Sequence, residues 1–228
     1  MSKISAAIIT FNEEKNIERC IDSLKNVVDE IVIIDSGSTD QTVEIATRLK
    51  AIVILNPFEG HIQQKNFAIT RTQFDWVISL DADEALSEEL RASILAVKEN
   101  LKGGGYIFSR LTNYCGKWIK HCGWYPDIKV RLFNKSITSW EGVVHEKLVY
   151  TKSISTELII GDLNHYSYYT EQEHLDRLKK YAQLSAEEKF KAKKGNENYK
   201  IIFSPIFKFI SVFMILTIFN TFLCFNFS

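Results

Sequence analysis

The stretch Trp76-Val77-Ile78-Ser79-Leu80-Asp81-Ala82-Asp83-Glu84 places an acidic cluster directly after a run of apolar residues. A short apolar run of this kind is typical of a strand that is covered on both faces of a parallel sheet. Two carboxylates at the end of such a strand repel each other unless a cation or solvent lies between them. The stretch therefore predicts a buried strand that ends in a site for a hard divalent ion, Mg²⁺ or Mn²⁺.

Three similar runs precede this one, and helical segments separate them. We predict strands at residues 4–10, 30–35, 51–55 and 76–80, and helices at about 13–24, 41–50, 60–72 and 87–100. Alternation of this kind indicates an α/β domain with a Rossmann-like, mostly parallel sheet. Ser38 and Ser87 stand where each would cap the helix that follows.

Polar side chains follow the first, second and fourth predicted strands. The three clusters are Thr10 to Glu13, Asp35 to Asp40 and Asp81 to Glu84. In an open α/β sheet, ligands bind beyond the carboxyl ends of the strands. We therefore expect the three clusters to converge on one crevice.

Length and composition limit the class of protein. The 228 residues can bury one full-sized core with a short appendage. The 28 basic and 28 acidic residues balance, so no overall field attracts nucleic acid, and we expect no nucleic-acid partner. The four cysteines form no Cys-x-x-Cys pair, and the amino terminus has no apolar run typical of a signal peptide. These features predict that the first domain stays in the cytoplasm.

The three polar clusters, with Lys65-Asn66 between them, resemble the family 2 inverting glycosyltransferases over about residues 4 to 150. The resemblance implies the nucleotide-diphospho-sugar transferase (GT-A) fold and a nucleotide-sugar donor. It implies that Asp35 contacts the nucleobase and that Asp83 binds the metal. The other residues that it assigns to the nucleotide-sugar are Thr10, Asn12, Glu13, Lys65 and Asp81. For Asp35 to Asp40, a solvated turn that caps the next helix is the alternative.

Three motifs in the second half narrow the resemblance. Gly123 to Asp127, Lys129 to Phe133 and Trp140 to Glu146 look like the branch that contains bacterial lipopolysaccharide core glucosyltransferases. That branch implies transfer of a hexose, typically glucose from UDP-glucose, to a lipopolysaccharide core acceptor. Branches that act on capsule, other glycan or peptide acceptors share parts of these motifs. Residues 103–161 are aromatic-rich and predicted to be irregular, and we expect acceptor recognition there.

An inverting transfer needs a general base that takes the proton from the acceptor hydroxyl. Asp127 is the first choice, because partial desolvation in an aromatic loop would raise its basicity and because it matches the place of the family's base motif. Pro126 replaces the acidic residue that often precedes that base. Glu146 is the second candidate and Glu141 the third.

Two further polar residues have alternative roles. His145 either ligates the metal from the far side of the diphosphate or is satisfied by backbone hydrogen bonds. Arg131 either binds phosphate or pairs with an acid at the sheet edge. The spacing of these residues does not decide between the alternatives.

The carboxyl-terminal part differs in composition from the rest. We predict a catalytic domain at 1–166 (1–100 for the nucleotide-sugar, 101–166 for the acceptor), a charged amphipathic helix at 167–200 and a hydrophobic tail at 201–228. Four lysines between residues 189 and 194 suit anionic headgroups. The tail either spans the bilayer or attaches at its surface, and we favour attachment to the cytoplasmic face of the inner membrane. The resemblance implies a basic carboxyl-terminal region, and this sequence has a short hydrophobic end in its place. That difference indicates truncation or divergence.

Two other functions fit parts of the pattern. A nucleotidyltransferase also binds a nucleoside diphosphate beside carboxylates, but its first turn is usually rich in glycine and basic residues. The turn Thr10-Phe11-Asn12-Glu13-Glu14 has neither. A membrane-tethered module that binds a nucleotide-sugar without turnover is the non-enzymatic alternative.

Overall fold

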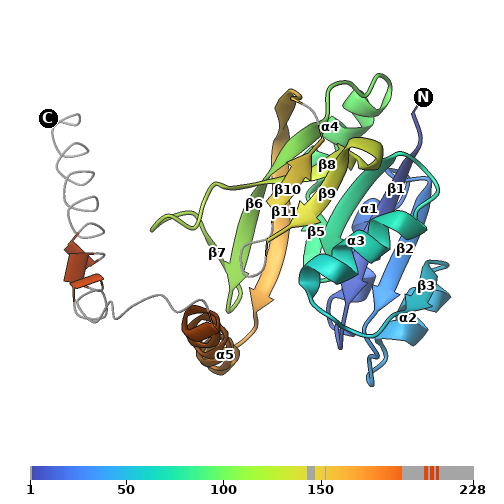
Figure 1. Ribbon diagram of the computed structural model, residues 1–228. Helices are drawn as coiled ribbons and strands as arrows, with labels where there is room; N and C mark the ends of the chain where they lie inside the picture. Colours follow the sequence, from blue (N-terminus) through green and yellow to red (C-terminus); the bar gives the residue numbers. More distant parts are fainter. Residues whose placement is uncertain are drawn as a thin grey trace, which may run out of the picture. The chain divides into compact units, whose positions relative to one another are not determined.

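The computed structural model describes residues 2–142, 147–151, 153–191, 203–204, 206–207 and 209–210. The chain divides into two compact units, Met1–His174 and Leu175–Ser228. The first unit contains the sheet and the helices that cover it (Figure 1).

The amino-terminal half alternates strands and helices, as the sequence predicts. The strands are β1 (Ile4–Thr10), β2 (Glu30–Asp35), β3 (Ile52–Leu55) and β4 (Trp76–Asp81), and the helices are α1 (Ile17–Leu24), α2 (Thr42–Arg48), α3 (His61–Arg71) and α4 (Glu88–Lys98). All four strands are parallel, in the order β3-β2-β1-β4. The α1 helix begins later than predicted, because residues 13–16 form a separate turn in which the Asn16 N–H donates to the Glu13 carbonyl oxygen.

The second half continues the same sheet, so the prediction of an irregular segment at 103–161 is wrong. Its strands are β5 (Glu84–Leu86), β6 (Gly105–Tyr114), β7 (Lys117–Ile119), β8 (Asp127–Asn134), β9 (Thr138–Glu141), β10 (Lys147–Tyr150) and β11 (Thr156–Tyr168). The sheet order is β3-β2-β1-β4-β8-β6-β11-β5, β8 runs antiparallel to both neighbours, and β9 pairs with β10 separately. These aromatic and polar segments form strands because they pair with neighbouring strands. Local hydrophobic periodicity does not reveal such pairing.

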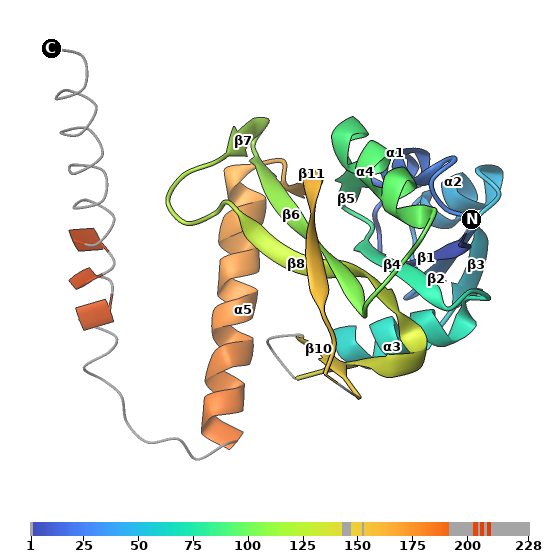
Figure 2. The same cartoon turned by 90° about the horizontal axis from the view of Figure 1, so that it is seen from above.

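The core lies on both faces of the sheet. Alternate β1 residues point to opposite faces, so Ile4 and Ile8 pack with α1 and α4 while Ala7 packs with α3. Figure 2 shows α3 on one face of the β1–β4 region and α1, α2 and α4 on the other. Burying each large apolar side chain stabilises the fold by about 1.5–3 kcal/mol. The strand ends that bear the polar clusters therefore stand on a rigid support.

The two predicted helix caps have different outcomes. The Ser87 Oγ accepts a hydrogen bond from the Leu90 N–H at the start of α4, which confirms that cap. Ser38 does not cap α2, because its hydroxyl bonds to Asp35. Asp40 stands closer to the helix start, and its carboxylate accepts from the Thr42 N–H at 3.0 Å.

The second unit includes most of α5 (Glu171–Lys191), the predicted charged helix. Its side chains Leu175, Leu178 and Tyr181 are about half exposed. Within the described residues, no helix is long and apolar enough to cross a membrane. Most of the predicted tail at 201–228 lies outside the described residues, and the predicted division at residue 166 stays a prediction.

Gly161 allows β11 to pass close to α4. It has a φ of +106°, and a Cβ placed there would lie 2.2 Å from the Leu90 backbone nitrogen. We expect Gly161→Ala to lower the free energy of unfolding by about 2–5 kcal/mol, from backbone strain and from the clash together. Gly116 is the matched control, because its φ is +84° and nothing lies within 4 Å of its added Cβ. Urea unfolding of Gly116→Ala should show the strain alone, about 1–2 kcal/mol, and equal losses in the two variants would contradict the close approach.

Candidate active site

The loops after β1 and β2 bind each other. The Asp35 carboxylate, 2% exposed, accepts from the Gly37 and Ser38 N–H groups, each at 2.9 Å. The Asn12 N–H donates to the Ser38 hydroxyl at 2.9 Å, and the Asn12 Oδ1 accepts from the Thr39 N–H at 2.8 Å. The predicted residues Asn12 and Asp35 therefore lie in one pre-ordered pair of loops.

Thr10 and Glu13 border the same loops. The Thr10 carbonyl oxygen accepts from the Ser36 N–H, and its buried hydroxyl has no hydrogen-bond partner among the described residues. The Glu13 N–H donates to the Thr42 hydroxyl at 2.8 Å, and its carboxylate accepts from the Asn16 side chain at 2.7 Å. The sequence thus predicted correctly that the first two clusters converge.

Asp81 ends β4 between two cations. Its carboxylate lies 3.2 Å from Lys65 Nζ on α3 and 3.1 Å from an Arg131 terminal nitrogen on β8. Lys65 and Arg131 are 4% and 3% exposed. Burial alone would raise the pKa of Asp81, but the charges and hydrogen bonds of Lys65 and Arg131 hold it well below its usual range. Asp81 is therefore a fixed anion, and each of its two oxygens has one cationic partner.

Glu84 is wholly buried and joins the acidic turn to the neighbouring strands. Its Oε2 accepts from the Asp81 N–H at 3.1 Å, and its Oε1 lies 2.5 Å from Arg131 and 3.3 Å from Arg110 on β6. Burial alone would lower the pKa of Arg131, but the charges of Glu84 and Asp81 raise it. Of the two roles predicted for Arg131, the structure shows the pairing with acids.

Asp83 has different surroundings from Asp81. Its Oδ2 lies 3.3 Å from His165 Nε2 on β11, and both side chains are 13% exposed. His165 Nδ1 lies 3.4 Å from the Thr112 hydroxyl. In the described part of the chain, Asp83 has no lysine or arginine partner. The turn thus holds one carboxylate that is neutralised by cations and one that is not.

These residues fit a hard divalent cation. No group of three or more His, Cys, Asp or Glu side chains that could enclose a metal is found in the described ranges. Mg²⁺ is commonly held by only one or two carboxylates, with phosphate oxygens and waters completing its shell. Asp83 suits that arrangement, because no lysine or arginine among the described residues competes for it. His145 and Glu146, predicted as metal ligand and second base, lie outside the described residues.

Asp127 begins β8 and is held by two cations. Its Oδ2 accepts from Arg110 Nε at 2.9 Å and from a terminal Arg110 nitrogen at 2.6 Å, while its Oδ1 lies 2.9 Å from Lys129 Nζ. Burial alone would raise the pKa of Asp127, but the hydrogen bonds and charges of Lys129 and Arg110 lower it. Desolvation thus acts in the predicted direction, but the expected net rise in the basicity of Asp127 is wrong for the free protein, because the two cations outweigh it.

Sequence reasoning placed Glu84 in the third polar cluster without an individual role, and it assigned no role to Arg110 or His165. Glu84 begins β5, three residues after β4 ends at Asp81, and the sequence does not show that its side chain is buried. Arg110 is opposite Asp127 in the β6–β8 register, and His165 is opposite Thr112 in the β11–β6 register. These contacts come from strand pairing and have no local sequence signal.

Removing Arg131 should destabilise the fold strongly, because the wholly buried Glu84 would lose its shortest cationic contact. We expect Arg131→Met to lower the free energy of unfolding by about 3–5 kcal/mol. The control is Arg48→Met, which breaks an exposed pair with Glu18 at 3.3 Å and should cost less than about 1 kcal/mol. Chemical denaturation measures both variants, and a small loss for Arg131→Met would show that the buried cluster contributes little.

Comparison with known proteins shows the family of the chain. The sequence pattern of Glycosyl transferase family 2 matches residues 5–142. An uncharacterized glycosyltransferase of Rickettsia typhi is 33% identical over 94% of this chain and 77% of its own length. An uncharacterized glycosyltransferase of Rickettsia bellii is 34% identical over 93% of this chain and 76% of its own length. The lipopolysaccharide core biosynthesis glycosyltransferase LpsC of Rhizobium meliloti is 29% identical over 92% of this chain and 80% of its own.

Among solved structures, the glucosyl-3-phosphoglycerate synthase of Mycobacterium tuberculosis is 28% identical, with a TM-score of 0.39, over 49% of this chain and 44% of that one. The family match covers the parallel strands, the loops after β1 and β2, and the acidic turn. The chain therefore belongs to glycosyl transferase family 2 and has a GT-A glycosyltransferase fold with a mixed sheet.

Proposed function

We propose that the chain is a metal-dependent inverting glycosyltransferase that moves a hexose, glucose from UDP-glucose, onto a lipopolysaccharide core acceptor. The observation that supports this most is the division of the acidic turn. Asp81 is neutralised by Lys65 and Arg131, whereas Asp83 has no such partner among the described residues. A site with one uncompensated carboxylate beside a pre-ordered loop pair suits a cation that arrives with a diphosphate.

The donor lies, in this proposal, over the carboxyl ends of β1, β2 and β4. Asp35 and Asn12 hold the two loops together and bind the nucleoside. Thr10, whose buried hydroxyl has no described partner, lines the same pocket. Asp81 contacts the ribose, and Asp83 holds the metal. When bound, the metal neutralises the charge that develops on the departing diphosphate.

The transfer itself is a single displacement. The acceptor hydroxyl oxygen forms a bond to the anomeric carbon of the hexose, and the bond between that carbon and the diphosphate oxygen breaks. Its electron pair leaves with UDP. Asp127 takes the hydroxyl proton, so the attacking oxygen becomes more nucleophilic as the bond forms.

The acceptor class and the location are part of the proposal. The likeness to LpsC, which is named for lipopolysaccharide core biosynthesis, supports a lipopolysaccharide core acceptor. The half-exposed Leu175, Leu178 and Tyr181 on α5 suit an apolar surface. Attachment to the cytoplasmic face of the inner membrane would bring the enzyme to a lipid-linked acceptor.

The metal role of Asp83 predicts that Asp83→Ala abolishes turnover and keeps the fold. UDP release from UDP-glucose with Mn²⁺ and a purified heptose-terminated lipopolysaccharide core should fall by at least about a hundredfold, because the cation loses its protein carboxylate. Binding of Mn²⁺, followed by its electron paramagnetic resonance signal in the presence of UDP, should weaken in parallel. Asp22→Ala is the control, since Asp22 pairs with Lys25 at the surface of α1. Full activity of Asp83→Ala would reject the metal role, and binding of UDP-glucose by the wild type without UDP release would favour the binding module.

The base role of Asp127 predicts a different pattern. Asp127→Asn keeps the size of the side chain but cannot accept the proton, so kcat should fall by about 10²–10⁴. Affinity for UDP and Mn²⁺ should stay near that of the wild type, because Asp127 has no role in donor binding. Steady-state kinetics and calorimetric titration with UDP separate the two effects. Wild-type kcat in Asp127→Asn would show that another acid is the base.

A further inference from the structure

We propose that Arg110 is a positioning residue for the general base: it holds Asp127 by Oδ2, and Oδ1, which Lys129 covers in the free protein, is the atom that takes the proton. This inference rests on the proposed function for the role of Asp127. It adds which oxygen reacts, which residue aims it, and which contact the acceptor must displace.

The two oxygens of Asp127 have unequal partners. Oδ2 accepts two hydrogen bonds from Arg110, at 2.9 and 2.6 Å, whereas the polar contact that Oδ1 makes within the described ranges is with Lys129 Nζ at 2.9 Å. Asp127 lies directly opposite Arg110 in the β6–β8 pair, and Lys129 is two residues further along β8, on the same face. Each oxygen is thus held from a different strand.

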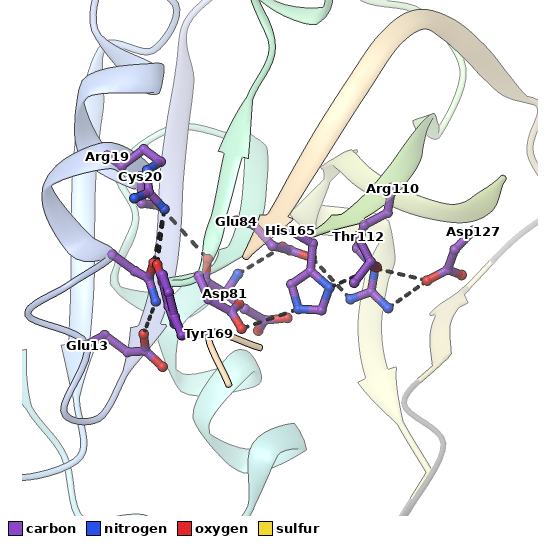
Figure 3. A network of polar contacts seen from close by, with 12 residues as sticks. Glu13, Arg19, Cys20, Asp81, Glu84, Arg110, Thr112, Asp127, His165 and Tyr169 are labelled. Carbon is purple, nitrogen blue, oxygen red and sulfur yellow. Dashed lines mark hydrogen bonds and ion pairs between the residues drawn. The ribbon is translucent and has the colours of Figure 1, made fainter. Parts of the chain in front are cut away.

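Arg110 is itself held by a buried group. A terminal nitrogen of its guanidinium lies 3.3 Å from Glu84 Oε1, and the Glu84 side chain is 0% exposed. The other Glu84 oxygen accepts from the Asp81 N–H at 3.1 Å. Figure 3 shows the resulting series of contacts from Asp81 through Glu84 and Arg110 to Asp127. The base and the acidic turn are therefore positioned from the same carboxylate.

The contact of Asp127 with Lys129 is easier to displace than its contact with Arg110. The Lys129 side chain is 44% exposed, whereas that of Arg110 is 20% exposed. An exposed lysine pair contributes little to stability, while a partly buried arginine with two charge-assisted bonds is costly to move. An acceptor hydroxyl that approaches Oδ1 displaces Lys129 and leaves the Arg110 contact intact.

Displacing Lys129 also makes Asp127 a stronger base. Among the residues that the structure describes, the charged groups that face Asp127 are Arg110 from β6 and Lys129 from β8, and both favour the ionised carboxylate. Together they lower the pKa of Asp127 in the free protein. When the acceptor replaces Lys129, one of the two charges leaves and the affinity of Asp127 for a proton rises. Full basicity is then reached only with the acceptor in place.

The test compares Arg110→Gln, Arg110→Lys and Lys129→Gln with the wild type, and Arg48→Gln, an exposed change on α2, is the control. The assay uses UDP-glucose, Mn²⁺ and the heptose-terminated lipopolysaccharide core. We expect Arg110→Gln to lower kcat by about a hundredfold, since a misaimed base is costly. Arg110→Lys, which keeps the charge without the two-bond geometry, should recover part of kcat. Lys129→Gln should lose less than about tenfold.

The pH dependence separates positioning from a structural role. Asp127 must be ionised to act, and both substitutions to Gln remove a charge that lowers its pKa. The acid limb of the kcat/KM profile should therefore move to higher pH in both, and the Asp127 carboxyl carbon should titrate at higher pH by NMR. A lower melting temperature and a raised KM with an unmoved acid limb would assign Arg110 a structural role only and overturn the inference.

The outcomes distinguish this inference from the proposed function. If Asp127→Asn abolishes turnover but Arg110→Gln keeps wild-type kcat, the proposed function stands and the positioning role fails. If Lys129→Gln loses as much kcat as Arg110→Gln, the assignment of Oδ1 fails. If the wild type releases no UDP, the proposed function fails, and an NMR titration of Asp127 that Arg110→Gln does not shift would overturn the contact as well.

Discussion

The wholly buried carboxylate of Glu84 is the constraint on which the catalytic half depends. An unpaired anion in that position would cost several kcal/mol, so cations must reach it from neighbouring strands. Arg131 comes from β8 and Arg110 from β6, while the Asp81 N–H completes the set. Because all three groups meet one carboxylate, the acidic turn and strands β6 and β8 keep a fixed mutual geometry.

That geometry gives each acid of the site its own partners. Asp81 is held as an anion by Lys65 and Arg131, while Asp83 faces His165. Asp127 stands on a different strand and is held by Arg110. Like charges placed close together would raise one another's pKa. The arginine and lysine contacts instead hold the pKa of Asp81 and the pKa of Asp127 below their usual range.

Much of the fold and part of the site could be predicted from local signals. The first four strands have the expected bounds to within a residue, and for β1, β2 and β4 the reason is that buried parallel strands are continuous apolar runs. The β3 strand lies at the edge of the sheet, where Ile52 and Leu55 are 50% and 71% exposed, so the expectation that it is covered on both faces is wrong. The loops after β1 and β2 meet as expected, since carboxyl ends of parallel strands share one edge of the sheet. Ser38 was misassigned because its hydroxyl has a better partner in Asp35 than in the α2 backbone, and a cap pattern alone cannot show that competition.

The sequence by itself determined the α/β order, the family and the strand ends at which the polar clusters stand. The tertiary structure decided which charges pair. Arg110 meets Asp127 and Glu84 across 17 and 26 residues of chain, and Arg131 meets Glu84 across 47. Such contacts depend on the register of antiparallel strands, and a shift of one residue would turn each side chain to the other face of the sheet. Arg110 and Lys129 lower the pKa of Asp127. Sequence reasoning considered burial alone and therefore predicted a raised pKa.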